Sequence, residues 1–181
     1  MAFSAAMSSP AVSLRPVQAR DRHALAAAFD RLSPESRYHR FLGPKNELTA
    51  RELTYLTDVD HVTHEAFVAI DPATEEIVGV ARYALGSSGH GDFAVVVADA
   101  WQRRGLGTAL ARRVIARAAM NGFAKLSATT LWENEPARGL CAKLGFRSRG
   151  GSHGVLDLEL DLRLPASAPG SVAGNRWSSV S

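Results

Sequence analysis

The chain has 181 residues, of which 46% are hydrophobic and 22% are charged, and a chain of this length can form one domain with a sizeable core. Its net charge of +3 is compatible with an anionic cofactor but too small to indicate a nucleic-acid partner. The single cysteine, Cys141, excludes an internal disulfide and provides no zinc-cluster spacing, so we expect no metal. No apolar run approaches the roughly 20 residues that span a bilayer, so we expect no membrane association.

Both ends of the chain have compositions typical of disordered segments. Residues 1–10 are small and polar and lack the basic start and long apolar run of a signal peptide, which favours a cytoplasmic protein. Residues 165–181 are rich in Ser, Ala, Gly and Pro, with Trp177 as a lone large apolar residue. We therefore expect one folded domain over residues 11–164.

The first third of the chain alternates between strand and helix patterns. Residues Val12–Val17 predict a short strand, and the apolar spacing over about Asp21–Leu32 predicts a helix. The sequence Ser33-Pro34-Glu35 is typical of a capped helix start, and Thr49–Leu56 predicts a second short helix.

The middle of the chain is rich in β-branched residues. Residues Ala66–Ile70 and Ile77–Leu85 predict paired strands joined by a turn at Asp71–Thr74. A third strand is expected over Asp92–Val97.

The last third predicts a long helix over about Gly105–Asn121, a strand over Leu126–Leu131, a helix from Asn134 to Leu144 and a closing strand over Leu156–Leu162. The whole pattern indicates an α/β fold in which a mostly antiparallel sheet is flanked by helices. We expect one strand–loop–helix crossover in this fold to hold the functional residues.

The segment from Asp92 to Thr108 joins a strand to a helix through a loop with two glycines, Gly105 and Gly107. Helix starts leave backbone N–H groups unpaired, and glycine lets the backbone approach a ligand closely, so such a loop suits a pyrophosphate. Arg103 and Arg104 add positive charge. The Walker and Rossmann phosphate-loop patterns are both absent, and the alternative interpretation of the two glycines is an ordinary surface turn.

Two motifs make the chain resemble the GNAT acetyltransferases. The sequence Q-R-R-G-L-G, from Gln102 to Gly107, is similar to that family's acyl-coenzyme A loop, and N-E-P-A-R-G-L-C-A-K-L-G-F, from Asn134 to Phe146, resembles its second signature. The segments Leu32–Phe41 and Glu47–Asp60 resemble the GNAT domains of Pat-type bacterial protein lysine acetyltransferases. The resemblance implies a GNAT-type mixed sheet of about six to seven strands and acetyl-CoA as the acyl donor.

The resemblance also implies roles for individual residues. Asp92 occupies the position of a glutamate base and is one methylene shorter, so it would act through a water. Tyr38, His39, Arg40 and Phe41 would wall the acceptor pocket. The residues implied in cofactor binding are Val95, Val96, Val97, Gln102, Arg103, Arg104, Gly105, Leu106, Gly107, Thr108, Asn134 and Cys141.

Several roles have alternatives. Asp92 can be a turn residue after Gly91, and Asn134 can cap its helix whether or not it also contacts the cofactor. Cys141 stands where many family members have a tyrosine that protonates the departing thiolate; it either donates weakly or is a small helix residue against the cofactor.

The leading functional hypothesis is an acetyl-CoA-dependent N-acetyltransferase acting by direct attack on a primary amine of a protein lysine, with an acyl-CoA synthetase as one possible protein acceptor. The alternatives are a small-molecule amine acetyltransferase and a module that senses acyl-CoA without catalysis.

Overall fold

A seven-stranded sheet organises residues 12–163, which are the part of the chain that the computed structural model describes. Its order is β1-β2-β3-β4-β5-β7-β6, and every neighbouring pair is antiparallel except β4 and β5. The strands are β1 (Ser13–Pro16), β2 (His64–Ile70), β3 (Ile77–Leu85), β4 (Gly91–Val97), β5 (Lys125–Leu131), β6 (Arg147–Ser152) and β7 (Val155–Asp161). This confirms the expected α/β class with a mostly antiparallel sheet. The predicted tails and Trp177 lie outside the described residues.

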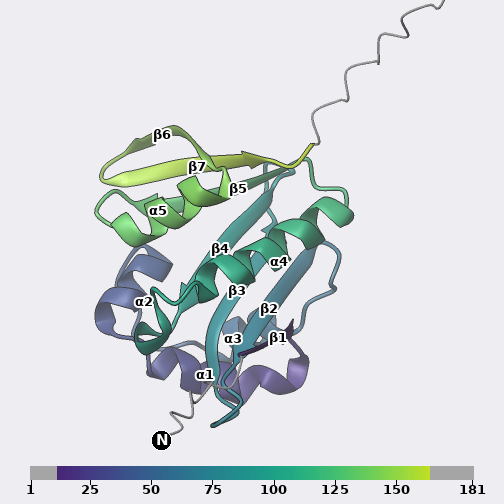
Figure 1. The fold of residues 1–181 in the computed structure, drawn as a ribbon, viewed down its shortest axis with the longest axis vertical. Coiled ribbons are helices and arrows are strands. Elements are labelled where there is room, and N and C mark those ends of the chain that lie inside the picture. The colour runs from purple at the N-terminus through teal and green to yellow at the C-terminus, as the bar shows by residue number, and fades with distance from the viewer. Residues whose placement is uncertain (1–11, 164–181) are drawn as a thin grey trace, which may run out of the picture.

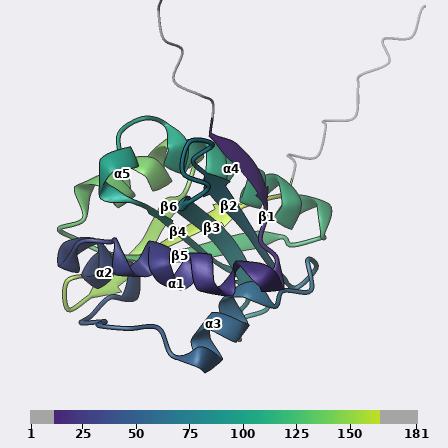
Figure 2. The same cartoon turned by 90° about the horizontal axis from the view of Figure 1, so that it is seen from below.

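Helices cover both faces of the sheet. The helices are α1 (Arg22–Asp30), α2 (Pro34–Phe41), α3 (Ala50–Thr57), α4 (Leu106–Met120) and α5 (Glu135–Leu144). Helix α4 crosses one face of β2–β4, while α1 and α3 lie on the opposite face (Figures 1 and 2). Among residues 12–163, no helix combines the length and apolar character that a membrane span requires.

The alternation of side chains along the strands creates two cores. On one face, which we call the α4 face, Ala81 and Phe93 pack with the buried stripe of α4 that includes Leu110 and Val114. On the other, which we call the α1 face, Ala66 and Val68 of β2 and Ile77 and Val80 of β3 form a second buried cluster with Leu25 of α1 and with Val17, the residue after β1. Each face therefore has its own environment for polar side chains.

Strands β4 and β5 meet only briefly. Their parallel pairing is limited to Gly91 with Leu126 and Asp92 with Ser127. Strand β4 continues to Val97 with β3 as its partner, and β5 continues to Leu131 with β7 as its partner. Within residues 12–163, the edge of β4 that faces β5 therefore lacks a strand partner beyond Asp92, and the two strands diverge (Figure 1).

Local sequence signals explain most element boundaries. The Ser33 hydroxyl accepts a hydrogen bond from the Ser36 N–H at 3.1 Å at the start of α2. Thr49 and Glu52 form a reciprocal capping box at the start of α3. The expected 21–32 helix differs: a short 3-10 turn ends at Asp21, whose carboxylate accepts a bidentate pair from Arg15 at 2.7 and 2.8 Å.

Candidate functional site

The open edge of β4 presents main-chain groups to the gap between β4 and β5. The Ala98 N–H donates to the Val78 oxygen at 2.9 Å, which directs Ala98 toward β3. Because residues of an antiparallel strand alternate in hydrogen-bonding direction, Val96 also bonds to β3, whereas Val95 and Val97 face the gap. Consistent with this, the Val97 oxygen accepts from Gln102 Nε2 at 3.0 Å, on the side away from β3.

Of the three valines expected to contribute backbone groups to cofactor binding, Val95 and Val97 direct theirs into the gap. Val96 instead turns its side chain to the α1 face, where it lines a pocket.

The start of α4 lies beside this edge. Gly105 adopts φ 80°, a left-handed conformation that favours glycine, and serves as the N-cap. The Ala109 N–H donates to the Gly105 oxygen at 3.0 Å. The N–H groups of Leu106, Gly107 and Thr108 precede that bond and so have no acceptor within the helix. They form a positively polarised helix start.

Gly107, in the first turn of α4, lies close to β4 and α5. A Cβ atom at this position would lie 3.6 Å from a Val97 methyl and 3.5 Å from a Leu140 methyl. The first turn of α4 is therefore within van der Waals reach of both β4 and α5, and the amides of the strand edge and of the helix start belong to one site.

The loop between β4 and α4 is anchored to α2. The Asp99 carboxylate accepts hydrogen bonds from the Ser33 N–H and hydroxyl and from the Ser36 hydroxyl. Gln102 Nε2 also donates to the Ser36 hydroxyl, at 3.4 Å. Gln102 is therefore a residue that fixes the loop as well as one that lines the gap.

The two loop arginines are exposed. The Arg104 guanidinium lies 5.2 Å from the centre of the Trp101 ring, and this cation–π contact restrains the arginine side chain. Arg103 adopts φ 59°. Both charges stand next to the unpaired amides of α4, where they add to the attraction for an anion.

The second predicted motif opens α5. The Asn134 Oδ1 accepts from the Ala137 N–H at 3.1 Å, so the expected N-cap is confirmed. Cys141 is buried in the same apolar cluster as Phe93 and Phe146. Burial raises the pKa of its thiol to about 11, so the side chain stays protonated and apolar in character, which favours packing over proton donation.

Asp92 lies on the α1 face of β4, four residues before Val96. Its side chain is exposed, and within residues 12–163 it makes no ion pair. The absence of a side chain at Gly86 makes room for it, because a Cβ atom there would lie 2.6 Å from Asp92 Oδ2. The carboxylate therefore lies directly against Gly86, and its oxygens accept no hydrogen bond from residues 12–163.

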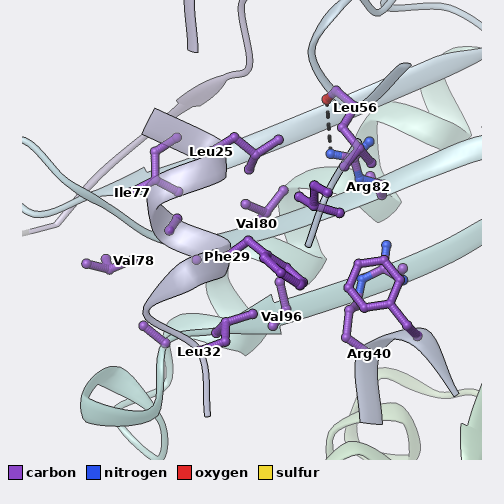
Figure 3. A pocket seen from close by; sticks show the side chains of 16 residues that line it. Leu25, Phe29, Leu32, Arg40, Leu56, Ile77, Val78, Val80, Arg82 and Val96 are labelled. Carbon is purple, nitrogen blue, oxygen red and sulfur yellow. Dashed lines mark hydrogen bonds between the residues drawn. The ribbon is translucent and has the colours of Figure 1, made fainter. Parts of the chain in front are cut away.

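A pocket lies on the same face, between the sheet and helices α1–α3 (Figure 3). It comprises about 570 Å³, including its opening to solvent. Its walls are mostly aliphatic and aromatic, from Leu25, Ala28, Phe29, Leu32, Phe41, Leu48, Leu56, Ile77, Val78, Gly79, Val80, Ala94, Val96 and Ala98. Two arginines, Arg40 and Arg82, complete the lining and lie at one end of the pocket (Figure 3).

Arg82 is bound by neutral groups only. Its guanidinium donates to the Leu56 oxygen at 3.1 Å and contacts His64 Nε2 at 3.2 Å. Burial, followed by the neighbouring charge of Arg82, lowers the pKa of His64 to about 4, so His64 is neutral near pH 7 and Nε2 accepts. Burial, followed by the charge of Arg40, lowers the pKa of Arg82 to about 9.

The sequence indicated part of this pocket. Of the four residues that the resemblance places around an acceptor pocket, Arg40 and Phe41 line the pocket described here, whereas Tyr38 and His39 are not in its lining. Arg82 was missed, although a single charged residue inside the apolar strand I-V-G-V-A-R-Y-A-L is a signal that could have marked it.

Comparisons with known proteins point to one family. Residues 26–146 match the model of the acetyltransferase (GNAT) family. The acetyltransferase PA5475 of Pseudomonas aeruginosa is 37% identical over 138 residues, which make up 75% of this chain and 74% of that protein.

Two solved structures illustrate the fold. The GNAT domain of S. lividans PAT has a TM-score of 0.77 at 28% identity and covers 83% of this chain and 90% of its own. The yncA protein of Salmonella typhimurium, solved with acetyl-CoA, has a TM-score of 0.67 at 19% identity and covers 88% of this chain and 99% of its own. The second likeness concerns the fold alone.

Proposed function

Because the chain belongs to the GNAT acetyltransferase family and uses acetyl-CoA as its acyl donor, we propose that it transfers the acetyl group directly to a primary amine held on the α1 face of β4. The observation that carries this proposal is the juxtaposition of three features: the open edge of β4, the unpaired start of α4 and the free carboxylate of Asp92.

The α4 start and its loop bind the diphosphate of the donor. The N–H groups of Leu106, Gly107 and Thr108 point out of the helix start, and diphosphate oxygens are suitable acceptors for them. Arg103 and Arg104 supply charge-assisted contacts from the loop. Gln102 keeps the loop in register with β4 through its bond to Val97.

The edge of β4 binds the pantetheine arm. Val95 and Val97 present N–H and C=O groups to the gap, so the amides of the arm pair with them as an added strand would. One of these N–H groups also donates a hydrogen bond to the thioester oxygen, where negative charge develops during the attack. Asn134, at the opposite side of the gap, retains its capping bond and offers its amide nitrogen to the arm.

Asp92 supplies the base. An alkylamine with a pKa near 10.4 is mostly protonated at neutral pH and must lose a proton before it attacks. The exposed Asp92 carboxylate takes this proton through a water molecule. The amine nitrogen then forms a bond to the acetyl carbon, the carbon–sulfur bond breaks, and the thiolate of coenzyme A leaves, which its thiol pKa near 8.5 allows without strong acid help.

The pocket favours a small amine as the acceptor. It lies on the same face as Asp92, and its mostly apolar walls suit the body of a small molecule. Its polar lining is cationic, so that end of the pocket attracts neither a lysine ammonium nor any other protonated amine. A protein lysine is the second candidate, supported by the 28% identity to the GNAT domain of S. lividans PAT. With a protein acceptor, such as an acyl-CoA synthetase, the lysine would enter beside the pocket rather than fill it.

A thiol-release assay tests the proposal. The protein is incubated with acetyl-CoA and a panel of small amines and lysine peptides, and free coenzyme A is measured. We expect release that depends on the amine and a raised melting temperature with acetyl-CoA alone. A raised melting temperature without release for any amine would instead identify a module that only senses acyl-CoA.

A further inference from the structure

The pocket on the α1 face contains two cations and no anion. Within residues 12–163, neither Arg40 nor Arg82 forms an ion pair with a carboxylate. Arg82 is only 6% exposed. They stand close enough for the charge of Arg40 to lower the pKa of Arg82, after the larger effect of burial.

Such an arrangement is unfavourable for the protein alone. Two like charges repel each other; Arg82 is buried and the half-buried Arg40 loses part of its hydration, and burial lowers the pKa of Arg40 as well. Arg82 is partly satisfied by the Leu56 oxygen and His64. The Arg40 guanidinium approaches an aromatic ring, Phe41, at 5.1 Å and has no hydrogen bond to an acceptor within residues 12–163. The pair is therefore short of one negative charge.

On the basis of the proposed function, the geometry points to an acceptor that carries both a primary amine and a carboxylate, with the carboxylate bound between Arg40 and Arg82. A guanidinium fork matches a carboxylate in shape as well as in charge. The ligand supplies the missing anion, and its binding relieves the repulsion between the two arginines.

The rest of the pocket defines the body of this acceptor. The walls opposite the arginines are apolar, and they include Leu32, Ile77 and Val78 (Figure 3). The acceptor therefore has an aliphatic or aromatic body, as in a hydrophobic amino acid or an ω-amino acid. A polyamine lacks the carboxylate and adds positive charge next to both arginines.

The register of the sheet places the amine end. Arg82 is directly opposite Ala94 on β4, and Asp92 is two residues from Ala94 on the same face. Two residues of a strand span about 7 Å. A molecule of amino-acid size anchored at the arginines thus extends its amine toward Asp92 and the edge of β4.

The test compares acceptors that differ only in the carboxylate. Leucine is paired with leucinamide, phenylalanine with phenylalaninamide, and 6-aminohexanoate with its amide, and kcat/KM is measured by coenzyme A release. Amidation of an α-amino acid lowers the pKa of its amine and leaves more free base, so the chemistry alone favours the amide. We nevertheless expect the acid to be favoured by about 10- to 100-fold in at least one pair.

Arg40→Gln should remove most of this preference, because it deletes one of the two cations while its neighbours keep their packing. Arg40→Lys should restore part of it, since the charge returns without the fork. Arg51→Gln is the matched control: it removes the same charge from an exposed position on α3 and should leave the preference intact. Arg82 also connects α3 to the sheet through its hydrogen bond to the Leu56 oxygen. The second variant is therefore the conservative change Arg82→Lys, which keeps the positive charge.

The outcomes separate the two proposals. Equal kcat/KM for acid and amide in all pairs, or an unchanged preference in Arg40→Gln, overturns the carboxylate site while acetyl transfer stands. A matched aminoalkyl phosphonate that outperforms the acid overturns the assignment of a carboxylate. Failure to release coenzyme A with any amine instead overturns the proposed function.

Discussion

Two buried charged side chains, one on β2 and one on the neighbouring β3, lie on opposite faces of the sheet and differ in how their charge is compensated. On the α4 face, Glu65 is 0% exposed and is compensated twice: His61 Nδ1 lies 2.8 Å and Arg117 Nη1 lies 3.6 Å from its carboxylate oxygens. On the α1 face, Arg82 is 6% exposed and faces a second cation, Arg40, without a carboxylate among the described residues.

The contrast separates structural charges from charges available to a ligand. A buried ion that serves the fold needs partners within the protein, because an unpaired one costs several kcal/mol. A charge that the protein leaves uncompensated, at the edge of a pocket, is ready for a partner from solution. Asp92 belongs to the second group, since it is exposed on the α1 face and forms no ion pair with any of the described residues.

The largest effect is expected for Asp92→Asn, which tests the free carboxylate of the α1 face. Loss of the base should lower kcat by about 100-fold or more, whereas the melting temperature and the acetyl-CoA affinity should hardly change, because Asp92 has no partner to lose. Steady-state kinetics and thermal shifts measure the two effects. Asp92→Glu is the control and should retain activity. Wild-type kcat in Asp92→Asn would refute the base assignment.

The next effect concerns the two ends of α4. Gly105→Ala adds a side chain at φ 80° beside the proposed diphosphate site, and we expect the Kd of acetyl-CoA, measured by calorimetry, to rise about tenfold. Gly122→Ala is matched to it, since Gly122 has φ 84° and open space around it at the other end of the helix. It should cost similar stability and leave the Kd unchanged. Equal Kd changes in the two variants would remove the helix start from the site.

A smaller effect, of the opposite kind, is expected for Glu65→Gln. The compensated cluster of the α4 face should lose roughly 1–3 kcal/mol of unfolding free energy, because the change removes a buried anion from His61 and Arg117. Urea unfolding measures this loss, and Glu47→Gln, at an exposed position, serves as the control. Acetyl transfer should persist. Unchanged stability with lost activity in Glu65→Gln would mean that this charge serves the reaction rather than the fold, which would contradict the contrast between the two faces.

The smallest effect is expected for Cys141→Ala. Because burial raises the thiol pKa to about 11, the thiol remains protonated through neutral and mildly alkaline pH and has little tendency to give up its proton. We expect kcat within about twofold of wild type and the same pH–rate profile. A large loss of kcat, with unchanged acetyl-CoA binding, would make Cys141 a proton donor after all.

Local signals in the sequence predicted most of the fold. The predicted caps at Ser33 and Asn134 are short-range features, and the structure confirms both. The capping box of Thr49 and Glu52 is a short-range feature of the same kind. Strand β6 was missed because R-S-R-G-G-S has no apolar alternation and its residues are exposed. It exists through its pairing with β7, a tertiary interaction that leaves no pattern within the segment itself.

The candidate site likewise has one part that the sequence shows directly and other parts that only the fold reveals. The loop from Gln102 to Gly107 is contiguous, so its glycines and arginines were visible as a motif. The alternation that turns Val95 and Val97 to the gap but Val96 to β3 depends on the register of β3 and β4. The meeting of Arg40 and Arg82 depends on how α2 packs on the sheet, and no local pattern contains that information.

Amide hydrogen exchange by NMR, with and without saturating acetyl-CoA, tests the central claim most directly. The Val95 and Val97 amides and those of Leu106 to Thr108 should exchange readily in the free protein and become protected in the complex. The Val96 amide, already bonded to β3, should be slow in both. Saturation without added protection at Val95 and Val97, or protection centred on another segment, would contradict the account.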